Sequence, residues 1–473
     1  MGEKLRVRRS RGLRQATLIL GSCLVLYCLC FVWRSPSKAG RWPRRRPWTL
    51  PGGLLSNLSL GEEQCKAAFP GLTKEIEDTV AQGPFTLKQT GDSGPLQGRI
   101  KDGHLYIIHA QRRADLSTEM LNSRTAALHQ LHRALITSPA PLPDTVFSLN
   151  FQDSPFGTSW TYSRPADRSQ SAPGGRNFLM PHFSFWAWPL PFVGSISRAA
   201  GAIASIEAAV PFGDKIPRAV WRGTTWFNSV HNPRLRQNLL KAARERTWDW
   251  ADIEALRWEG GNASNAIRIE DFCRYRYAVH TEGIAYSGRF QFLQMCASVT
   301  VTTPIGWMQH TTHLVRPVFS STLLKEGGGG RSSKRRPGAK TGTARGGAVV
   351  GTHDGRTSGS GAAGHVWTPS ERVRKSWPVM YMPEEANIVF VAPDWSDLEE
   401  TIGWLEDHPD VAEGIGRRQR DTFVGRGYFS PAAEACYWRA LVRGWAEVVR
   451  TDGQGWEDHE GVPFETFALS NGE

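Results

Sequence analysis

The stretch CRYRYAVHTEGIAYSGRFQFLQMCASVTVTTP, residues 273–304, decides the fold class of this chain. It begins with a strand pattern, passes through a glycine-bearing turn and a helical pattern, and ends in a β-branched strand over residues 298–303. Strand, turn, helix and strand in this order form the repeating unit of α/β proteins. In open α/β sheets, ligands bind beyond the carboxyl ends of the strands, so the turns that follow strands are examined first for functional residues.

Further strand and helix patterns occur on both sides of this stretch. In chain order they are a helix over 118–138, strands over 145–151 and 216–222, a helix over 233–246, a strand over 387–392, one or two helices over 398–423 with Pro409 at the break, and a helix opened by Ser430 and Pro431. The alternation runs over about 350 residues without a single Gly-rich fingerprint and predicts two doubly wound α/β domains with a cleft between them.

An uncharged run follows a basic N-terminus. Residues 16–33 (ATLILGSCLVLYCLCFVW) would span roughly 27 Å as a helix, close to the hydrocarbon thickness of an endoplasmic-reticulum or early Golgi bilayer. Six basic residues precede the run and should hold the N-terminus in the cytosol. A cleaved signal peptide is the alternative, but the run is long for one, and no small-residue cleavage site follows closely. We predict a single-pass, type II signal anchor in the Golgi or endoplasmic-reticulum membrane, with a lumenal body.

The net charge of +12 is concentrated outside the predicted body. Residues 1–48 hold twelve Lys and Arg against one acidic residue, and residues 331–375 hold ten against two. The remainder of the chain is therefore mildly acidic, whereas a nucleic-acid footprint requires basic residues on a folded face. We expect no nucleic-acid partner.

The cysteines and the sequons agree with a lumenal body. Three of the seven Cys lie in the apolar run, and the other four suit two disulfides in an oxidising compartment. Spacing alone allows three pairings, and four buried free thiols are the alternative. Asn57 and Asn262 each begin an Asn-X-Ser glycosylation pattern.

The sequence contains no metal-binding motif: HExxH, a CxxC pair and Asp-x-Asp are all absent, as are a P-loop and GxSxG. A diphosphate would then be bound by cationic side chains and backbone N–H groups. Arg222 in WRG and Arg289 in GIAYSGR are candidates, because glycine permits close approach and Arg offers a bidentate fork. A solvated turn is the alternative for each of them.

A carboxylate and three aromatic side chains are further candidates. Asp153 follows the strand at 145–151, where it could deprotonate an attacking hydroxyl. The alternative for Asp153 is a turn residue that caps local N–H groups. His182, Trp186 and Trp188 in PHFSFWAWPLPF could form a wall against a sugar or the acceptor, with core packing as their alternative.

Residues 143–450 resemble glycosyltransferase family 90, the capsule-associated-protein-like family that includes the animal protein O-glucosyltransferases. The matching pieces, in the family's order, are PDTVFSLNFQDSP, FSFWAWP, AVWRGTT, DFCRYRYAVHTEGIAYSGRFQFLQMCASVTV, SDLEETIGWLEDHPDVAEGIGRRQRD and ACYWRALVRGW. The stretch YFSPAAEACYWRALVRGW is similar to a fungal branch. The resemblance implies a GT-B fold, in which two Rossmann-like domains face a cleft, and inverting transfer from a nucleotide sugar without a metal or other cofactor.

The resemblance also implies roles for particular residues. Asp153 matches the catalytic base of the family. The family positions that bind the donor's diphosphate are matched by Arg222, Ser287 and Arg289. The glycines that shape the neighbouring turns are matched by Gly223 and Gly283. Two disulfides are matched, Cys273 with Cys296 and Cys65 with Cys436. The segment 325–375 departs from the family pattern and is predicted to be a disordered insert.

The predicted organisation follows from these features. In chain order it is a cytosolic basic tail over 1–15, the signal anchor over 16–33, a stem over 34–60, an acceptor-side α/β domain over 61–195, a nucleotide-sugar α/β domain over 196–428 with the insert at 325–375, and a C-terminal helix and tail over 429–473.

The predicted function is metal-independent, inverting transfer of xylose or glucose from a UDP-sugar. The acceptor is expected to be a hydroxyl of a glycan, polysaccharide or glycoprotein in the secretory pathway. A non-catalytic lumenal carbohydrate-binding protein on the same fold is the alternative, and a membrane-tethered scaffold is a second one. The presence of Asp153, Arg222 and Arg289 together favours the enzyme.

Overall fold

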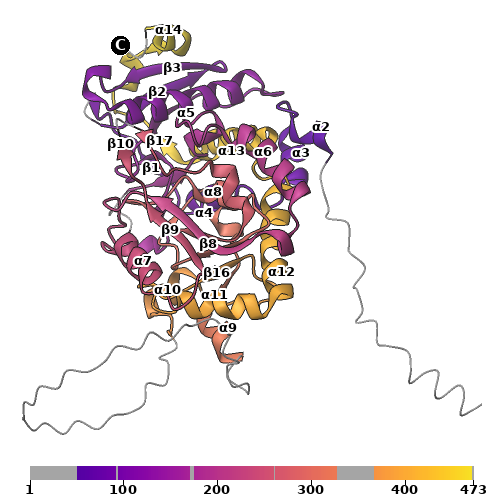
Figure 1. Cartoon of the computed structure of the whole chain (residues 1–473). Helices are drawn as coiled ribbons and strands as arrows, with labels where there is room; N and C mark the ends of the chain where they lie inside the picture. The colour runs from indigo at the N-terminus through magenta and orange to yellow at the C-terminus, as the bar shows by residue number, and fades with distance from the viewer. Residues whose placement is uncertain (1–50, 92–93, 171–174, 260–261, 327–366, 471–473) are drawn as a thin grey trace, which may run out of the picture. The chain divides into compact units, whose positions relative to one another are not determined.

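The computed structural model describes residues 51–91, 94–170, 175–259, 262–326 and 367–470 (Figure 1). These residues belong to one compact unit. Within them, no helix combines the length and the apolar character that crossing a membrane requires. The predicted tail at 1–15 and signal anchor at 16–33 lie outside the described residues.

Two segments predicted as stem and insert are partly folded. Inside the stem range, 34–60, helix α2 (Gly52–Leu55) forms and Leu60 is buried in the core. The predicted insert, 325–375, begins in helix α9 (Ser320–Glu326) and ends in helix α10 (Glu371–Ser376). The folded body therefore reaches into both segments.

The strand patterns within residues 273–304 form the centre of a parallel sheet. Strands β12 (Tyr275–His280) and β13 (Val299–Thr302) pair in parallel, and β13 is buried over its whole length. This burial is typical of a parallel sheet that is covered on both faces. The six strands have the order β15-β16-β13-β12-β8-β9, and every pair is parallel. The remaining strands are β8 (Ile216–Gly223), β9 (Ala251–Ala255), β15 (Pro317–Phe319) and β16 (Ile388–Phe390).

Helices accompany the strands of this sheet. They are α6 (Ile196–Ala209), α7 (Leu235–Arg244), α8 (Phe290–Leu293), α11 (Leu398–Asp407) and α12 (Pro409–Arg420). The break predicted at Pro409 is confirmed, because Pro is accommodated at the first position of α12. The helix predicted after residue 288 is only the four-residue α8.

A second six-stranded sheet is mixed, with the order β18-β3-β2-β4-β5-β7. The pairs from β18 to β4 are antiparallel, and the pairs from β4 to β7 are parallel. Its strands are β2 (Leu96–Lys101), β3 (His104–His109), β4 (Thr145–Leu149), β5 (Ser159–Thr161), β7 (Asn177–Leu179) and β18 (Val462–Pro463). The unexpected β2–β3 hairpin turns at Asp102 and Gly103, whose φ angles of 51° and 78° suit a two-residue turn of type I′.

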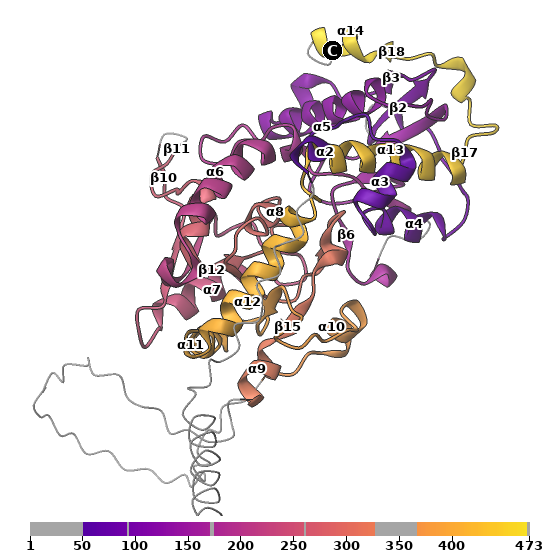
Figure 2. The same cartoon turned by 90° about the vertical axis from the view of Figure 1, so that its right-hand side faces the viewer.

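C-terminal segments complete the core of this mixed sheet. Helix α13 (Pro431–Val448) packs against β4, against α4 (Lys74–Val80) and against α5 (Thr118–Ile136). Figures 1 and 2 show α13, in yellow, among the indigo and purple elements of the mixed sheet. Helix α14 (Phe464–Leu469) contacts β3. The predicted cap of α13 is confirmed, since the Ser430 side chain accepts from the N–H of Ala433 at 3.2 Å.

Both disulfides that the family resemblance implies are present. Cys65–Cys436 joins α3 (Glu62–Ala68) to α13, across 371 positions of the sequence. Cys273–Cys296 joins the 3₁₀ helix η6 (Ile269–Arg274) to the end of the segment that contains α8. The alternative of four free thiols is therefore wrong.

Short strand pairs complete the fold. They are β1 (Phe85–Thr86) with β17 (Val449–Arg450), β6 (Arg164–Pro165) with β14 (Trp307–Met308), and β10 (Trp258–Glu259) with β11 (Asn262–Ala263). The β6–β14 pair connects a loop of the mixed sheet with a loop of the parallel sheet. The expected α/β class is confirmed, whereas the division into two GT-B domains across a cleft stays a prediction.

Candidate active site

Asp153 lies in the loop that follows β4, and the side chain of Asn150 shapes this loop. Asn150 Oδ1 accepts from the N–H of Gln152 at 2.9 Å, and its Nδ2 donates to the carbonyl of Ser154 at 2.9 Å. Asn150 therefore fills the turn-capping role that was the alternative for Asp153. Within the described part of the chain, the Asp153 carboxylate has no hydrogen-bond or ion-pair partner.

Two residues behind this loop hold its backbone in place. Ser123 of α5 donates to the carbonyl of Phe151 at 2.9 Å, and its Oγ lies 2.9 Å from the hydroxyl of Tyr162. Tyr162 is buried, and burial raises the pKa of its hydroxyl. The negative charge of Asp153 acts in the same direction, so the two side chains lie close together. The position of Asp153 is thus set by α5 and by the end of β5.

The Asp153 side chain is exposed to solvent, and yet the surrounding protein atoms raise the pKa of its carboxyl. The positive charge of Arg236 opposes this effect and lowers the pKa. A carboxylate that reaches solvent, has a raised pKa and lacks a partner is suited to general-base chemistry.

Two arginines lie close together beyond the ends of β8 and β12. Arg236, on α7, is 5% exposed, and Arg289, immediately before α8, is half-buried. Burial lowers the pKa of Arg236 to about 9 and that of Arg289 to about 10, and the charge of Arg289 adds to the lowering at Arg236. No carboxylate among the described residues pairs with either one. Buried cations without a counter-ion are unfavourable, so this arrangement favours an anionic ligand.

Backbone carbonyls orient the Arg236 guanidinium. Its Nε and Nη2 donate to the carbonyl of Glu282 at 3.2 and 3.0 Å, and its Nη1 donates to the carbonyl of Thr224 at 2.8 Å. These contacts connect α7 to the loops after β12 and β8. The guanidinium is therefore fixed before any ligand arrives.

Arg289 is held by one carbonyl and two aromatic rings. Its Nη1 donates to the carbonyl of Arg222. Its guanidinium lies 5.9 Å from the ring centre of Trp221 and 6.0 Å from that of Phe272, within the range of cation–π contacts. Most of its N–H groups remain available for a ligand.

The turn from Gly283 to Tyr286 lies near Arg236 at its start and near Asp153 at its end. The N–H of Gly283 donates to the carbonyl of Tyr286 at 3.0 Å, and a Cβ at Gly283 would lie 2.9 Å from that oxygen. Glycine is therefore needed here. Burial, and then the charge of Asp153, raise the pKa of the Tyr286 hydroxyl, which has no hydrogen-bond partner among the described residues.

Arg222 makes different contacts from those expected of a phosphate ligand. Its Nη2 donates to Asp252 Oδ1 at 2.7 Å, its Nη1 to the carbonyl of Asp252 at 2.8 Å, and its Nε to the carbonyl of Asn265 at 3.2 Å. The Arg222 side chain thus lies against the neighbouring strand β9. The structure brings its carbonyl, and not its guanidinium, to Arg289, because side chains alternate between the two faces of a strand.

The other predicted donor-binding residues lie at the same sheet edge. Gly223 ends β8, and its carbonyl accepts from the N–H of Leu256 at 2.9 Å. Ser287 is half-buried, directly precedes Gly288 and Arg289, and its carbonyl accepts from the N–H of Phe290 at 3.0 Å. Its hydroxyl makes no hydrogen bond with another described residue.

The predicted aromatic wall is not formed as a unit. His182 is buried, with its Nδ1 2.8 Å from Ser184 Oγ, and its ring lies 5.4 Å from that of Trp188 and 5.5 Å from that of Tyr286. Trp186 stacks instead on His129 of α5, with ring centres 4.9 Å apart. His182 and Trp188 therefore pack behind Tyr286, as in the core-packing alternative, and Trp186 lies on a different surface.

Comparisons with known proteins identify similar sequences. Residues 92–320 match the family model "Glycosyl transferase family 90". This part of the chain is therefore similar to glycosyltransferase family 90. The protein named O-glucosyltransferase rumi, from Drosophila melanogaster, is 20% identical over 243 residues, which cover 49% of this chain and 58% of that relative. The chain thus spans somewhat more than half the length of this relative.

The matched segment, residues 92–320, contains every candidate residue of the site, including two that sequence reasoning missed. Arg236 was part of a helical pattern and was not singled out. Leu239, Leu240 and Ala243 follow it by three, four and seven positions and are buried. This spacing places Arg236 on the same, apolar face of α7, which could have marked it as a buried arginine. Tyr286 lies inside the quoted turn, and no local pattern distinguishes it from a core tyrosine.

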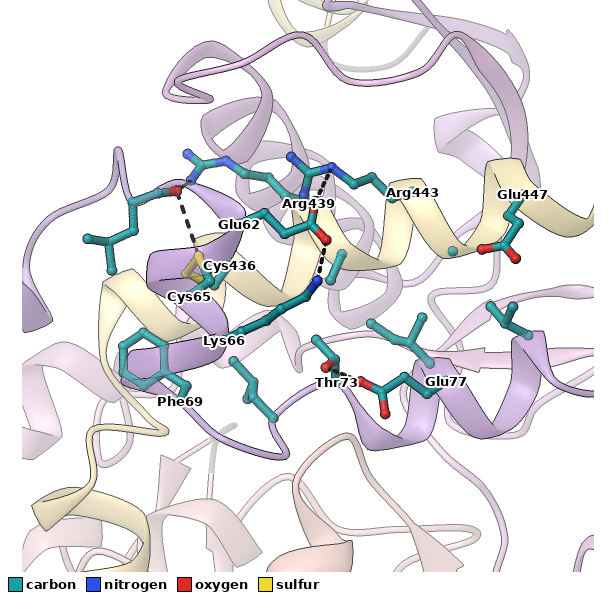
Figure 3. A pocket seen from close by; sticks show the side chains of 16 residues that line it. Glu62, Cys65, Lys66, Phe69, Thr73, Glu77, Cys436, Arg439, Arg443 and Glu447 are labelled. Carbon is teal, nitrogen blue, oxygen red and sulfur yellow. Dashed lines mark hydrogen bonds and ion pairs between the residues drawn. A yellow bond between two sulfur atoms is a disulfide. The ribbon is translucent and has the colours of Figure 1, made fainter.

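A cavity of about 260 Å³ lies outside this site, between α3, α4 and α13 (Figure 3). The Cys65–Cys436 disulfide lines it, and so do Glu62 and its ion-pair partners Lys66 and Arg443. No predicted catalytic or donor-binding residue lines this cavity. We therefore do not assign the reaction to it.

One group of side chains has the spacing of metal ligands in the described part of the chain. It consists of Glu207, Cys273 and Cys296. The two cysteines form a disulfide, and Glu207 pairs with Lys215 at 2.8 Å. Because thiolates rather than disulfides bind metals, this group is not a metal-ligand set.

The two sequons differ in how far they can be placed. Asn57 is exposed, and its Oδ1 accepts from the N–H of Ser59 at 2.9 Å. Asn262 belongs to β11, and its side chain lies outside the described structure. Glycosylation of both stays a prediction.

Proposed function

We propose that this protein is an inverting, metal-independent glycosyltransferase that moves xylose or glucose from a UDP-sugar to a hydroxyl of a glycan, polysaccharide or glycoprotein. The observation that carries the proposal is the unpaired carboxylate of Asp153, which lies near the positive charge of Arg236. Arg236 in turn lies beside Arg289. Single displacement needs a base for the acceptor and positive charge for the leaving group. The name of the Drosophila relative supports glucose as one of the two sugars.

In the proposed reaction, Asp153 accepts the proton of the acceptor hydroxyl while the hydroxyl oxygen bonds to the anomeric carbon. The bond from that carbon to the phosphate oxygen of UDP breaks on the opposite face, which inverts the configuration. Negative charge then develops on UDP, and Arg236 and Arg289 stabilise it. Because backbone carbonyls already orient both guanidinium groups, little reorganisation is needed during the reaction.

We assign the remaining donor-site residues to supporting roles. Ser287 is placed to donate its hydroxyl to a phosphate oxygen, and Gly223 and Gly283 shape the turns at the sheet edge. Arg222 acts through its carbonyl, which positions Arg289. In this assignment, Arg236 takes the phosphate contact that the family resemblance gave to the Arg222 guanidinium.

The proposed enzyme needs no metal or other cofactor. Arg236 and Arg289 provide the positive charge that a divalent ion would otherwise supply to the diphosphate. Transfer is therefore expected to continue at an unchanged rate in EDTA. Loss of transfer in EDTA, with recovery on addition of Mg²⁺ or Mn²⁺, would contradict this part of the proposal.

We also propose that the protein is a single-pass, type II membrane protein of the Golgi or endoplasmic reticulum, with a lumenal body. The apolar run at 16–33 and its basic flank support this location, and so do two disulfides, which persist in oxidising compartments. Resistance of the full chain to carbonate extraction, together with glycosidase-sensitive modification, is the expected result. Release of the protein by carbonate would contradict the anchor.

The proposed transfer is tested with the full-length protein and a panel of UDP-sugars. UDP release is measured with and without oligosaccharide and glycoprotein acceptors, and the products are analysed for anomeric configuration. UDP-glucose or UDP-xylose is expected to be consumed in an acceptor-dependent way, with an inverted linkage. Binding of these sugars without any turnover would instead favour the non-catalytic carbohydrate-binding protein.

A further inference from the structure

The loop after β8 is fixed at both ends by one residue of α7. The carbonyl and the Oγ of Thr224 accept from Arg236 Nη1 at 2.8 and 3.1 Å. Asn228 Oδ1 accepts from the backbone N–H of the same arginine at 3.0 Å. The five-residue segment from Thr224 to Asn228 is therefore anchored to a group that the proposed reaction uses.

Polar groups of this segment are paired within the segment and with α7. The carbonyl of Thr225 accepts from Asn228 Nδ2 and from Gln237 Nε2, each at 2.9 Å. Between these anchors, Trp226 and Phe227 are 62% and 43% exposed, with ring centres 6.0 Å apart. Exposure of two large rings on an anchored loop is unfavourable in water and marks a binding surface.

The apolar surface continues onto the turn beside Asp153. The N–H of Val230 donates to the carbonyl of Ile284 at 3.3 Å, and these two side chains are 63% and 37% exposed. Ile284 belongs to the turn between Gly283 and Tyr286, whose tyrosine lies under the field of Asp153. This hydrogen bond thus joins the chain just after the β8 loop to the turn whose tyrosine lies near Asp153.

We infer that Trp226, Phe227, Val230 and Ile284, here called the aromatic rim, bind the carbohydrate chain of the acceptor. The inference rests on the proposed function and extends it beyond the reacting hydroxyl. The four rim side chains offer no counter-ion to a charged ligand and therefore suit a neutral occupant, whereas the loop is anchored to Arg236, which we assign to the anionic donor. Flat aromatic faces match the C–H faces of sugar rings and lose little conformational entropy when they bind.

The test compares rim variants of the full-length protein in acceptor and donor kinetics. Trp226→Ala is expected to raise the KM for soluble manno-, gluco-, galacto- and xylo-oligosaccharide acceptors at least about fivefold. The KM for the UDP-sugar and the UDP release without acceptor should change little. Trp226→Phe, which keeps a ring, should restore most of the acceptor affinity. Trp186→Ala is the matched control, since that tryptophan is 39% exposed but stacks on α5.

Three results would overturn the inference. An unchanged acceptor KM in Trp226→Ala removes the rim from acceptor binding. A raised donor KM instead shows that the rings hold the nucleotide. If wild type transfers sugar to a peptide that carries no glycan, and Trp226→Ala does not, then the rim binds protein and not carbohydrate.

Direct binding separates failure of the rim from failure of the proposed function. The same oligosaccharides are titrated against wild type and Trp226→Ala, and tryptophan fluorescence is followed without any UDP-sugar. If the oligosaccharides bind to wild type and bind more weakly to Trp226→Ala, the rim is supported, even if no UDP-sugar is turned over. Absence of binding by wild type to every oligosaccharide overturns the rim, even if transfer to another acceptor occurs.

Discussion

Asp153 is the residue on which the proposed chemistry depends most directly. Asp153→Asn keeps the size of the side chain and removes the proton acceptor, so transfer should fall by about 10²- to 10⁴-fold, while UDP affinity changes little. Because the surrounding protein atoms raise the pKa of Asp153, the wild-type rate should also fall as the pH is lowered toward that raised pKa. Transfer rates across a pH series and calorimetric titration with UDP measure both effects.

A matched control for this variant exists at the other end of β4. Asp144 is exposed, and its Oδ1 accepts from the N–H of Asp102 at 2.8 Å, which an asparagine can also do. Asp144→Asn should retain wild-type transfer. If Asp153→Asn also retained it, the assignment of the base would be wrong.

The contacts of Arg289 and Arg222 predict opposite outcomes for their alanine variants. Arg289 has no carboxylate partner among the described residues, so Arg289→Ala should weaken UDP binding by about 10- to 100-fold. Arg222 pairs with Asp252, so Arg222→Ala should mainly lower thermal stability and weaken UDP binding less. Calorimetric UDP titrations and melting temperatures of both variants provide the comparison. The opposite ranking in UDP affinity would return the phosphate contact to the Arg222 guanidinium.

Glu282 makes stability depend on pH. Its Oε1 accepts from the N–H groups of Gly306 and Trp307 at 2.9 and 2.8 Å, and burial raises its pKa from 4.5 to about 8. The folded state then holds a proton that the unfolded state releases. The stabilising contribution of Glu282 is complete below pH 4.5 and is lost as the pH rises through about 8.

Glu282→Gln keeps the acceptor oxygen and cannot titrate. Its melting temperature should therefore fall less than that of wild type between about pH 5 and pH 8. Glu63→Gln, an exposed substitution on α3, should leave the wild-type pH dependence unchanged. If the melting temperatures of Glu282→Gln and wild type changed in parallel with pH, the Glu282 carboxyl would already be ionised near pH 5.

The limits of sequence reasoning are clearest at the two arginines. The WRG motif correctly predicted that Arg222 lies at the end of a strand, beside the site. The partner of its guanidinium, Asp252, comes from a neighbouring strand thirty positions later, and no local pattern predicts that pairing. For Arg236, the burial of one helix face was predictable, but the absence of a counter-ion depends on distant segments.

At the scale of elements, local signals predicted most boundaries. Helix α5 was expected over 118–138 and is found at Thr118–Ile136, because Pro139 disfavours continuation and Ser117 caps the start. The β2–β3 hairpin was missed, although Asp102-Gly103 is a strong turn signal. Pairing of β2 with β4 depends on long-range register, and the sequence carries no local signal for it.

The two disulfides should differ in what their removal affects. Replacing Cys65 and Cys436 by serine frees α3 from α13, whose main packing partners do not include α7 or α8, and should cost about 2–5 kcal/mol of stability with little change in UDP affinity. Replacing Cys273 and Cys296 frees η6, whose Phe272 contacts the Arg289 guanidinium, so UDP binding should weaken as well. Melting temperatures and UDP titrations of both double variants test this. Equal UDP affinities in the two variants would contradict a role of η6 at the site.

At the scale of the whole molecule, the core of the mixed sheet includes side chains that are distant in sequence. Trp438 and Trp445 of α13 are fully buried and lie 6.0 and 5.7 Å from the ring of Trp160 in β5. Trp445 also donates to the carbonyl of Val146 in β4 at 2.7 Å. The alternation of strands and helices predicted the α/β class, but only the family resemblance, through the Cys65–Cys436 pairing, indicated that α13 returns to this sheet.

A fragment limited to residues 51–195 should therefore not fold cooperatively. Without α13, the faces of β4 and α5 that contact it would be exposed, and loss of a buried tryptophan alone costs about 3–5 kcal/mol. Joining residues 429–470 to the fragment through a flexible linker should restore a cooperative thermal transition, followed by near-ultraviolet circular dichroism. A cooperative transition in 51–195 alone would show that the mixed sheet is independent of α13.

The Cys65–Cys436 bond also determines the order of events during synthesis. Its two cysteines are separated by 371 positions, which at ribosomal rates of about 5–20 residues per second means that Cys65 waits roughly 20–75 s for its partner. During that interval, the mixed sheet lacks α13, whereas all strands of the parallel sheet are synthesised before α13 begins. The part of the body that is made first is therefore the part that matures last, and it depends on folding assistance for longest.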